Sequence, residues 1–150
     1  MIHRQYRQQV VPAPLDEVWA YFATPQNLNE MTPEDMKFEI VHGGKEKMFQ
    51  GQIIEYRVQF MPLVKSLWLT EIAHVQEGSY FVDEQRVGPY RFWYHEHSFK
   101  AVEGGTQITD RVTYAMPFGF LGEIVHALWI GRRLKGIFDF RRGKIQELFG

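Results

Sequence analysis

Six segments rich in β-branched and aromatic residues follow one another through the middle of the chain, and they constrain the fold more than any other feature. They cover residues 37–44, 51–60, 64–75, 79–87, 91–102 and 106–116. The turns between them contain glycine or proline and are mostly short, and short turns join antiparallel neighbours. The sequence therefore predicts an antiparallel sheet whose strands follow one another in chain order.

The segments before these strands change hydrophobic period. Residues 3–11 alternate polar side chains with Tyr6 and end in an apolar pair, which predicts a first strand with one face in solvent. Residues 12–24 carry apolar side chains at three- and four-residue spacing after Pro14, which predicts a short helix. Residues 24–35 are interrupted by two prolines and are typical of a broken second helix or a loop.

The last part of the chain predicts one long helix. Residues 118–150 keep helical spacing for about thirty residues, or ~45 Å at the helical rise. The apolar positions are Leu121, Ile124, Val125, Leu128, Leu134, Phe138, Ile145 and Leu148. Six basic residues in its second half are expected mainly to be solvated, although a few could meet a ligand anion or a membrane surface. They are Arg132, Arg133, Lys135, Arg141, Arg142 and Lys144.

Composition limits the functions that the chain can have. A length of 150 residues with 45% hydrophobic content predicts a single domain over residues 1–150, with a sizeable core and material to spare for a cavity. The formal net charge of -1 provides no basic field for nucleic acid. No apolar run approaches the ~20 residues of a membrane span, so stable membrane insertion is not expected, and the absence of cysteine fits a cytoplasmic protein.

Side-chain alternation predicts which residues face inward, because residues two apart on a strand share a face. On residues 91–102, the charged side chains of Glu96 and Lys100 fall on one face, so the other face is expected to point inward. The same argument on each strand selects Ile54, Tyr56, Val58 and Phe60; Trp68, Thr70 and Ile72; Phe81, Asp83, Gln85 and Val87; Trp93, His95, His97 and Phe99; and Ile108, Asp110, Val112 and Tyr114.

The inward face holds several polar groups, and each one left without a partner would cost about 1–3 kcal/mol. A two-residue turn at Glu103-Gly104 or at Gly104-Gly105 would place Asp110 opposite His97 or opposite Phe99. In both registers Asp110 is within direct or diagonal reach of His97. A carboxylate there would orient the imidazole and favour its charged form.

Several motifs resemble those of the SRPBCC superfamily, which includes START-like lipid-transfer domains, pollen allergens and polyketide cyclase/dehydrase-like proteins. They are "VVPAPLDEVWAYFATPQNL", "FVDEQRVGPYRFWYHEHSF" and "GGTQITDRVTYAMPFG", followed by the long helix. The chain looks most similar to bacterial ligand-binding SRPBCC proteins. This resemblance implies the α+β helix-grip fold, a curved antiparallel sheet around a long C-terminal helix with a hydrophobic cavity between them. The strand and helix patterns agree, with about seven strands and two short helices after the first.

The principal hypothesis is that the protein binds or carries a small hydrophobic molecule, such as a lipid, polyketide or isoprenoid, without a cofactor. The expected ligand-binding residues are Tyr56, Trp68, Phe81, Asp83, Gln85, Trp93, His95, His97, Phe99, Asp110, Val112, Tyr114 and Leu128. Two alternatives stay open. One is a cofactor-independent cyclase or dehydratase with catalytic candidates His97, Asp110, Asp83 and Tyr114, and the other is a protein-interaction module.

Two further features bear on the site and its entrance. His95 and His97 could bind a metal with a third ligand such as Asp110 or His74, but the spacings of the cupin metal motif are not matched, so no metal is expected. Met61-Pro62 interrupts an apolar run and predicts a hairpin tip near one entrance of the cavity. Transient contact with a membrane, during exchange of an apolar ligand, is compatible with the sequence.

Overall fold

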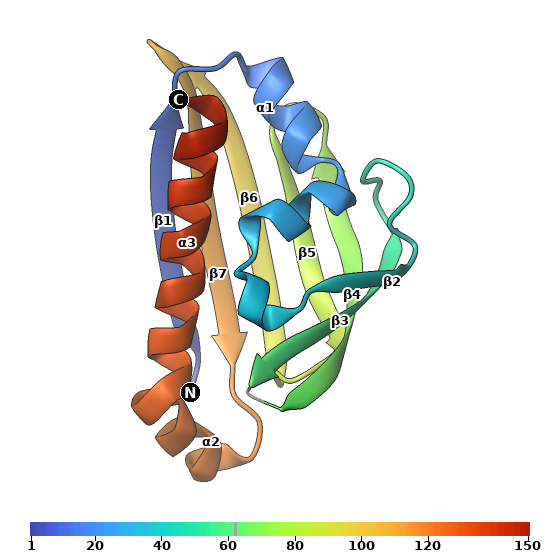
Figure 1. Cartoon of the computed structure of the whole chain (residues 1–150), viewed down its shortest axis with the longest axis vertical. Helices are drawn as coiled ribbons and strands as arrows, with labels where there is room; N and C mark the ends of the chain where they lie inside the picture. Colours follow the sequence, from blue (N-terminus) through green and yellow to red (C-terminus); the bar gives the residue numbers. More distant parts are fainter. Residues whose placement is uncertain (62) are drawn as a thin grey trace.

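A curved seven-stranded antiparallel sheet partly surrounds a long C-terminal helix in the computed structural model, which describes residues 1–61 and 63–150 (Figure 1). The strand order is β1-β7-β6-β5-β4-β3-β2. The strands are β1 (His3–Val11), β2 (Glu39–His42), β3 (Ile53–Met61), β4 (Val64–Gln76), β5 (Tyr80–Val87), β6 (Phe92–Val102) and β7 (Gly105–Ala115). The predicted helix-grip fold is confirmed. The predicted side chain of Phe60 and the predicted tip at Met61-Pro62 lie outside what the structure describes.

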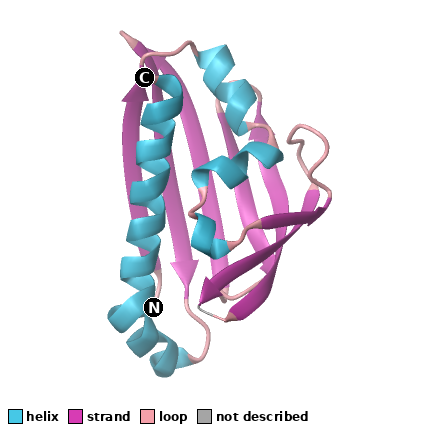
Figure 2. Ribbon diagram, in the orientation of Figure 1, coloured by secondary structure: helices cyan, strands magenta, loops and turns pink. Residues whose placement is uncertain are grey.

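The helices gather on one side of this sheet (Figure 2). The helix α1 (Leu15–Phe22) is followed by two 3₁₀ segments, η1 (Pro25–Met31) and η2 (Glu34–Met36). Pro25 at the start of η1 has no backbone N–H to donate, so the chain begins a new segment there instead of extending α1. These segments cover the part of the sheet that the C-terminal helix leaves open (Figure 1).

The C-terminal helix is continuous but changes its winding. It consists of α2 (Gly119–Val125), a π-helical turn η3 (His126–Ile130) and α3 (Gly131–Phe149). Buried residues of α3 are Leu134, Phe138, Arg141 and Ile145, spaced by three or four. The part before α3 lies beyond the end of β7 (Figure 1), and four of its predicted apolar positions are exposed although their helical spacing was predicted correctly: Leu121, Ile124, Val125 and Leu128. Among the described residues, no helix is long and apolar enough to cross a membrane.

Alternation along the strands places the predicted side chains inside. The four inward residues of β6 are 3–7% exposed, and those of β7 are 2–6% exposed. Val87 is the exception at 49% exposed, because it ends β5 and follows a register shift in the pairing of β4 with β5. The hairpin between β6 and β7 pairs Val102 with Gly105, so the turn residues are Glu103-Gly104 and Asp110 stands opposite His97.

Candidate ligand-binding pocket

A pocket of about 140 Å³ lies between the sheet and the helical segments. Its walls are mainly aromatic and aliphatic, with one polar side formed by Asp83, His95, His97 and Arg141. Of the residues predicted to bind ligand, seven line this pocket. They are Tyr56, Trp68, Phe81, Asp83, Trp93, His95 and His97.

Two predicted binding residues are placed elsewhere by local structure. Gln85 forms a clamp on the turn between β5 and β6: its Nε2 donates to the Tyr90 carbonyl (2.6 Å), and its Oε1 accepts from the Tyr90 amide (3.0 Å). Leu128 is 71% exposed. It belongs to the π turn, which precedes the stretch of helix that packs on the sheet, so its inclusion in the pocket was wrong.

Four others face inward but are covered by neighbouring elements. Phe99 packs with α1 and the end of α3, and Val112 and Tyr114 pack with the start of α3. Asp110 lies behind His95, outside the pocket. Alternation predicts the face of a strand on which a side chain lies, but it does not predict which other element covers that side chain. The predicted pocket therefore included residues of β7 that do not line it.

The residues that sequence reasoning missed come from the helices. Met31 and Met36 from the 3₁₀ segments, and Leu134, Phe138 and Arg141 from α3, complete the pocket walls. For α3 a signal was available, since these three positions lie four and three residues apart on the apolar face of the helix. The 3₁₀ segments carry no such periodic signal.

Two histidines and two aspartates form a buried network on the polar side of the pocket. His97 Nε2 is hydrogen-bonded to Asp83 Oδ2 (2.5 Å), and His95 Nε2 to Asp110 Oδ1 (2.7 Å). The two imidazoles stack with ring centroids 3.6 Å apart. A longer contact of 3.4 Å joins His97 Nδ1 to Asp110 Oδ1. The predicted proximity of Asp110 and His97 is confirmed, but the shortest hydrogen bond of Asp110 goes to His95.

Arg141 completes this network from α3. It is only 8% exposed, and its Nη2 donates to His97 Nδ1 (3.3 Å). Because a guanidinium carries donors only, Nδ1 must accept, and the proton of a neutral His97 ring is therefore on Nε2, where it donates to Asp83. The expectation that Arg141 is solvated like its neighbours was wrong. It lies three residues after Phe138 and four before Ile145, on the buried face of the helix.

Burial, the hydrogen bonds within the network and the charge of Arg141 determine the charges of its members. Burial, together with the adjacent His95, lowers the pKa of His97 to about 4, and the hydrogen bond with Asp83 only partly opposes this. Burial would raise the pKa of Asp110, but Arg141 and the His95 hydrogen bond lower it well below its usual range. Burial would also raise the pKa of Asp83, but its hydrogen bond with His97 and the nearby His95 lower it. At neutral pH His97 is thus neutral, in contrast to the expected charged form, and both carboxylates are charged.

The polar side can therefore accept hydrogen bonds from a ligand. The Asp83 side chain is 20% exposed and lines the pocket, whereas that of Asp110 is 9% exposed and does not. Asp83, His95 and His97 also lie close enough to share one metal ion. The positive charge of Arg141 beside His97 opposes a second cation, so the absence of a metal here stays our prediction.

Residues 11–136 match the family model for polyketide cyclase / dehydrase and lipid transport. The chain belongs to this family. Its SRPBCC-type architecture, inferred from sequence motifs, is thereby confirmed. No curated protein sequence matches significantly.

Solved structures of this type show the same fold at low sequence identity. Ginseng major latex-like protein 151 from Panax ginseng has a TM-score of 0.71 at 11% identity, covering 100% of this chain and 99% of that one. The Zhui aromatase/cyclase from Streptomyces sp. R1128 has a TM-score of 0.69 at 15% identity, covering 96% and 93%. A protein from Thermus thermophilus has a TM-score of 0.70 at 17% identity, covering 98% and 95%. At these identities the similarity establishes the fold alone.

Proposed function

We propose that the protein binds or carries a small hydrophobic molecule, of the lipid, polyketide or isoprenoid kind, in the pocket beneath α3. The observation that supports this most is a pocket with mainly apolar, aromatic walls that also contains the polar cluster of Asp83, His95, His97 and Arg141. Apolar walls supply affinity, and a few polar groups supply orientation. A ligand hydroxyl would donate to the charged Asp83.

The size of the pocket suggests which part of a ligand it holds. A volume of about 140 Å³ is close to that of an engineered apolar cavity, about 150 Å³, that binds benzene. One ring or a short branched chain therefore fits without rearrangement. A larger ligand would have to displace side chains of η1 and η2, such as Met31 and Met36, whose flexible thioethers repack readily.

Filling the pocket should abolish binding. Val58 is 3% exposed and lines the pocket, so in Val58→Phe the larger side chain occupies the ligand space. Native mass spectrometry of freshly purified wild-type protein, followed by organic extraction, is expected to find a bound organic mass that the extraction removes. In Val58→Phe the occupancy should fall about tenfold or more, because a loss of ~1.4 kcal/mol of binding free energy weakens affinity tenfold. Val87→Phe, at a residue that is 49% exposed, is the control and should bind normally.

A wild-type protein that carries no organic mass, and that also shows no saturable uptake of 4-methylphenol, a single ring with one hydroxyl, would contradict the proposal. Equal occupancy in wild type and Val58→Phe would place the ligand outside this pocket.

The alternative, a cyclase- or dehydratase-type enzyme, is supported by Asp83 and His97, which are hydrogen-bonded at the pocket wall. The other catalytic candidates, Asp110 and Tyr114, do not line the pocket. A histidine with a pKa of about 4 is also a weak base at neutral pH, which favours binding over catalysis. Conversion of the extracted ligand to a product of different mass by wild type, but not by Asp83→Asn, would favour the enzyme.

Transient contact with a membrane surface is a further part of the proposal. Exposed apolar side chains gather around α2: Phe118 (83% exposed), Phe120 (74%), Leu121 (58%), Ile124 (49%) and Leu128 (71%). The exposed basic residues Arg132 and Lys135 follow on the same helix. An apolar helix stretch beside basic residues suits an anionic lipid interface, whose headgroups complement the charges.

The double variant Leu121→Glu/Leu128→Glu is expected to lose most co-sedimentation with phosphatidylserine-containing vesicles. Two charges at an apolar interface oppose insertion and repel anionic lipid. Leu67→Glu, at an exposed position of β4, is the matched control and should sediment like wild type. Co-sedimentation that the double variant retains would rule out this surface. A dimer in wild type that the double variant disrupts would instead support the interaction module.

A further inference from the structure

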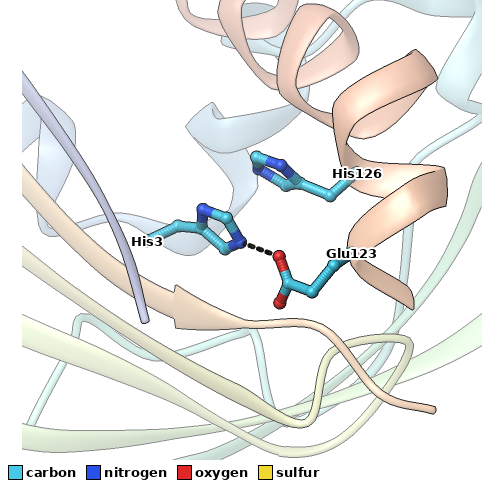
Figure 3. A group of neighbouring side chains, drawn as sticks. All are labelled: His3, Glu123 and His126. Atoms are coloured by element: carbon cyan, nitrogen blue, oxygen red, sulfur yellow. Dashed lines mark hydrogen bonds and ion pairs between the residues drawn. The ribbon is translucent and has the colours of Figure 1, made fainter. Parts of the chain in front are cut away.

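A second group of potential metal ligands lies outside the pocket, where the start of β1 meets α2. It consists of His3, Glu123 and His126, each of which offers one ligand atom within 4.8 Å of the others. His3 Nε2 is hydrogen-bonded to Glu123 Oε2 (2.8 Å), and the His3 and His126 rings stack with centroids 3.7 Å apart. Figure 3 shows the two imidazoles one above the other with the carboxylate beside His3.

Regular secondary structure brings the three side chains together. Glu123 and His126 are three residues apart on the helix and so share one of its faces. His3 pairs with Tyr114 in the sheet, and the Tyr114 hydroxyl is hydrogen-bonded to His126 Nε2 (2.7 Å). The π turn begins at His126, and π turns within helices occur often at functional sites. The group is thus held by two strands and a helix.

The donor atoms and the exposure of the group suit a cation. The three side chains offer two imidazole nitrogens and one carboxylate oxygen. Metals bind neutral imidazole and charged carboxylate. The side chains of His3 and Glu123 are 15% and 25% exposed, so a hydrated ion can reach them.

We propose that His3, Glu123 and His126 bind a divalent transition-metal ion of the zinc type, with a further coordination position open to water. Two imidazoles and one carboxylate are a known ligand set for Zn²⁺, at about 2.0–2.2 Å from the ion. Because the two rings are stacked, both would have to rotate about their side-chain torsions before one nitrogen of each points toward the same ion. The Met1 amine, 3.6 Å from Glu123 Oε1, would give up its contact with the carboxylate. The bound ion would fasten α2 to the first residue of β1.

Titration calorimetry with Zn²⁺ on chelator-treated protein without a histidine tag tests this proposal. The expected result is saturable binding of one ion, weakened by at least about tenfold in His3→Ala and in His126→Ala, because even the loss of a supporting partner of a ligand costs 10–100-fold. Zinc at a hundredfold excess over its dissociation constant should raise the melting temperature by about 5–10 °C. The double variant His3→Ala/His126→Ala should show no such rise.

Two controls separate this group from other histidines. His74→Ala removes an exposed histidine and should leave zinc binding unchanged. His95→Ala removes a member of the network in the pocket, and the loss of zinc binding in that variant alone would overturn the proposal. Unchanged binding in the double variant, or no saturable binding by wild type, would also overturn it. Should the double variant fail to fold, Glu123→Gln, which keeps the shape of the side chain, gives the same decision.

Discussion

The Arg141→Met variant is expected to lose about 3–5 kcal/mol of the free energy of unfolding at pH 7, the usual cost of removing one partner of a buried charged network. Arg141 is 8% exposed and donates to His97, and its charge lies near two aspartates that stay ionised at neutral pH. Methionine keeps much of the apolar stem, so the loss reports mainly on charge and hydrogen bonding. Urea denaturation at pH 7 measures it, provided that the m value is unchanged.

The next residue on the helix gives the matched control. Arg142 is exposed and its side chain makes no hydrogen bond within the described part of the chain, so Arg142→Met should change stability by no more than about 0.5 kcal/mol. Adding Asp110→Asn to Arg141→Met should recover part of the loss, because one of the two carboxylate charges that Arg141 compensated is then removed. If Arg141→Met and Arg142→Met both changed the free energy of unfolding by the same small amount, the Arg141 guanidinium would not compensate the buried carboxylates.

Stability is also expected to fall by about 3 kcal/mol between pH 7 and pH 4, because of His97. Its pKa is about 4 in the folded protein, against about 6.5 when unfolded. At pH values between these two pKa values, His97 binds a proton in the unfolded chain but not in the folded protein, so lowering the pH favours unfolding. A difference of about 2.5 pKa units at about 1.4 kcal/mol each corresponds to about 3–4 kcal/mol in full, and about 3 kcal/mol of it is reached by pH 4, where half of the folded molecules carry the proton. A series of urea denaturation curves across this range measures it.

The carboxylates extend the loss to lower pH. The pKa values of Asp83 and Asp110 are lowered by folding, so their contribution is complete above the unfolded value of about 3.9 and disappears as the pH falls toward the folded values. His97→Gln should therefore flatten the curve between pH 7 and pH 4 but leave a decline below pH 4. His74→Gln, at an exposed position, should keep the full slope. A curve for His97→Gln that matches wild type would contradict the assignment to His97.

Local patterns in the sequence were sufficient for the architecture and for the direction of most strand side chains. The two-residue period on β6 and β7 is a geometric property of extended chain, so the inward faces of His95, His97 and Asp110 follow from it alone. The spacing of apolar residues likewise determined the long helix. The family motifs agreed with both. The expected cytoplasmic location stays a prediction from composition.

Tertiary structure decided the depth and partners of each side chain. The two possible turns at Gly104 left the register open, and only the assembled sheet placed Asp110 opposite His97 while its shortest bond went to His95. Arg141 is chemically equivalent to Arg142, yet packing of α3 against the sheet buries the first and leaves the second in solvent. Periodicity reports which side of an element is apolar. Which residues another element then covers depends on contacts between segments far apart in the sequence, and no local pattern contains them.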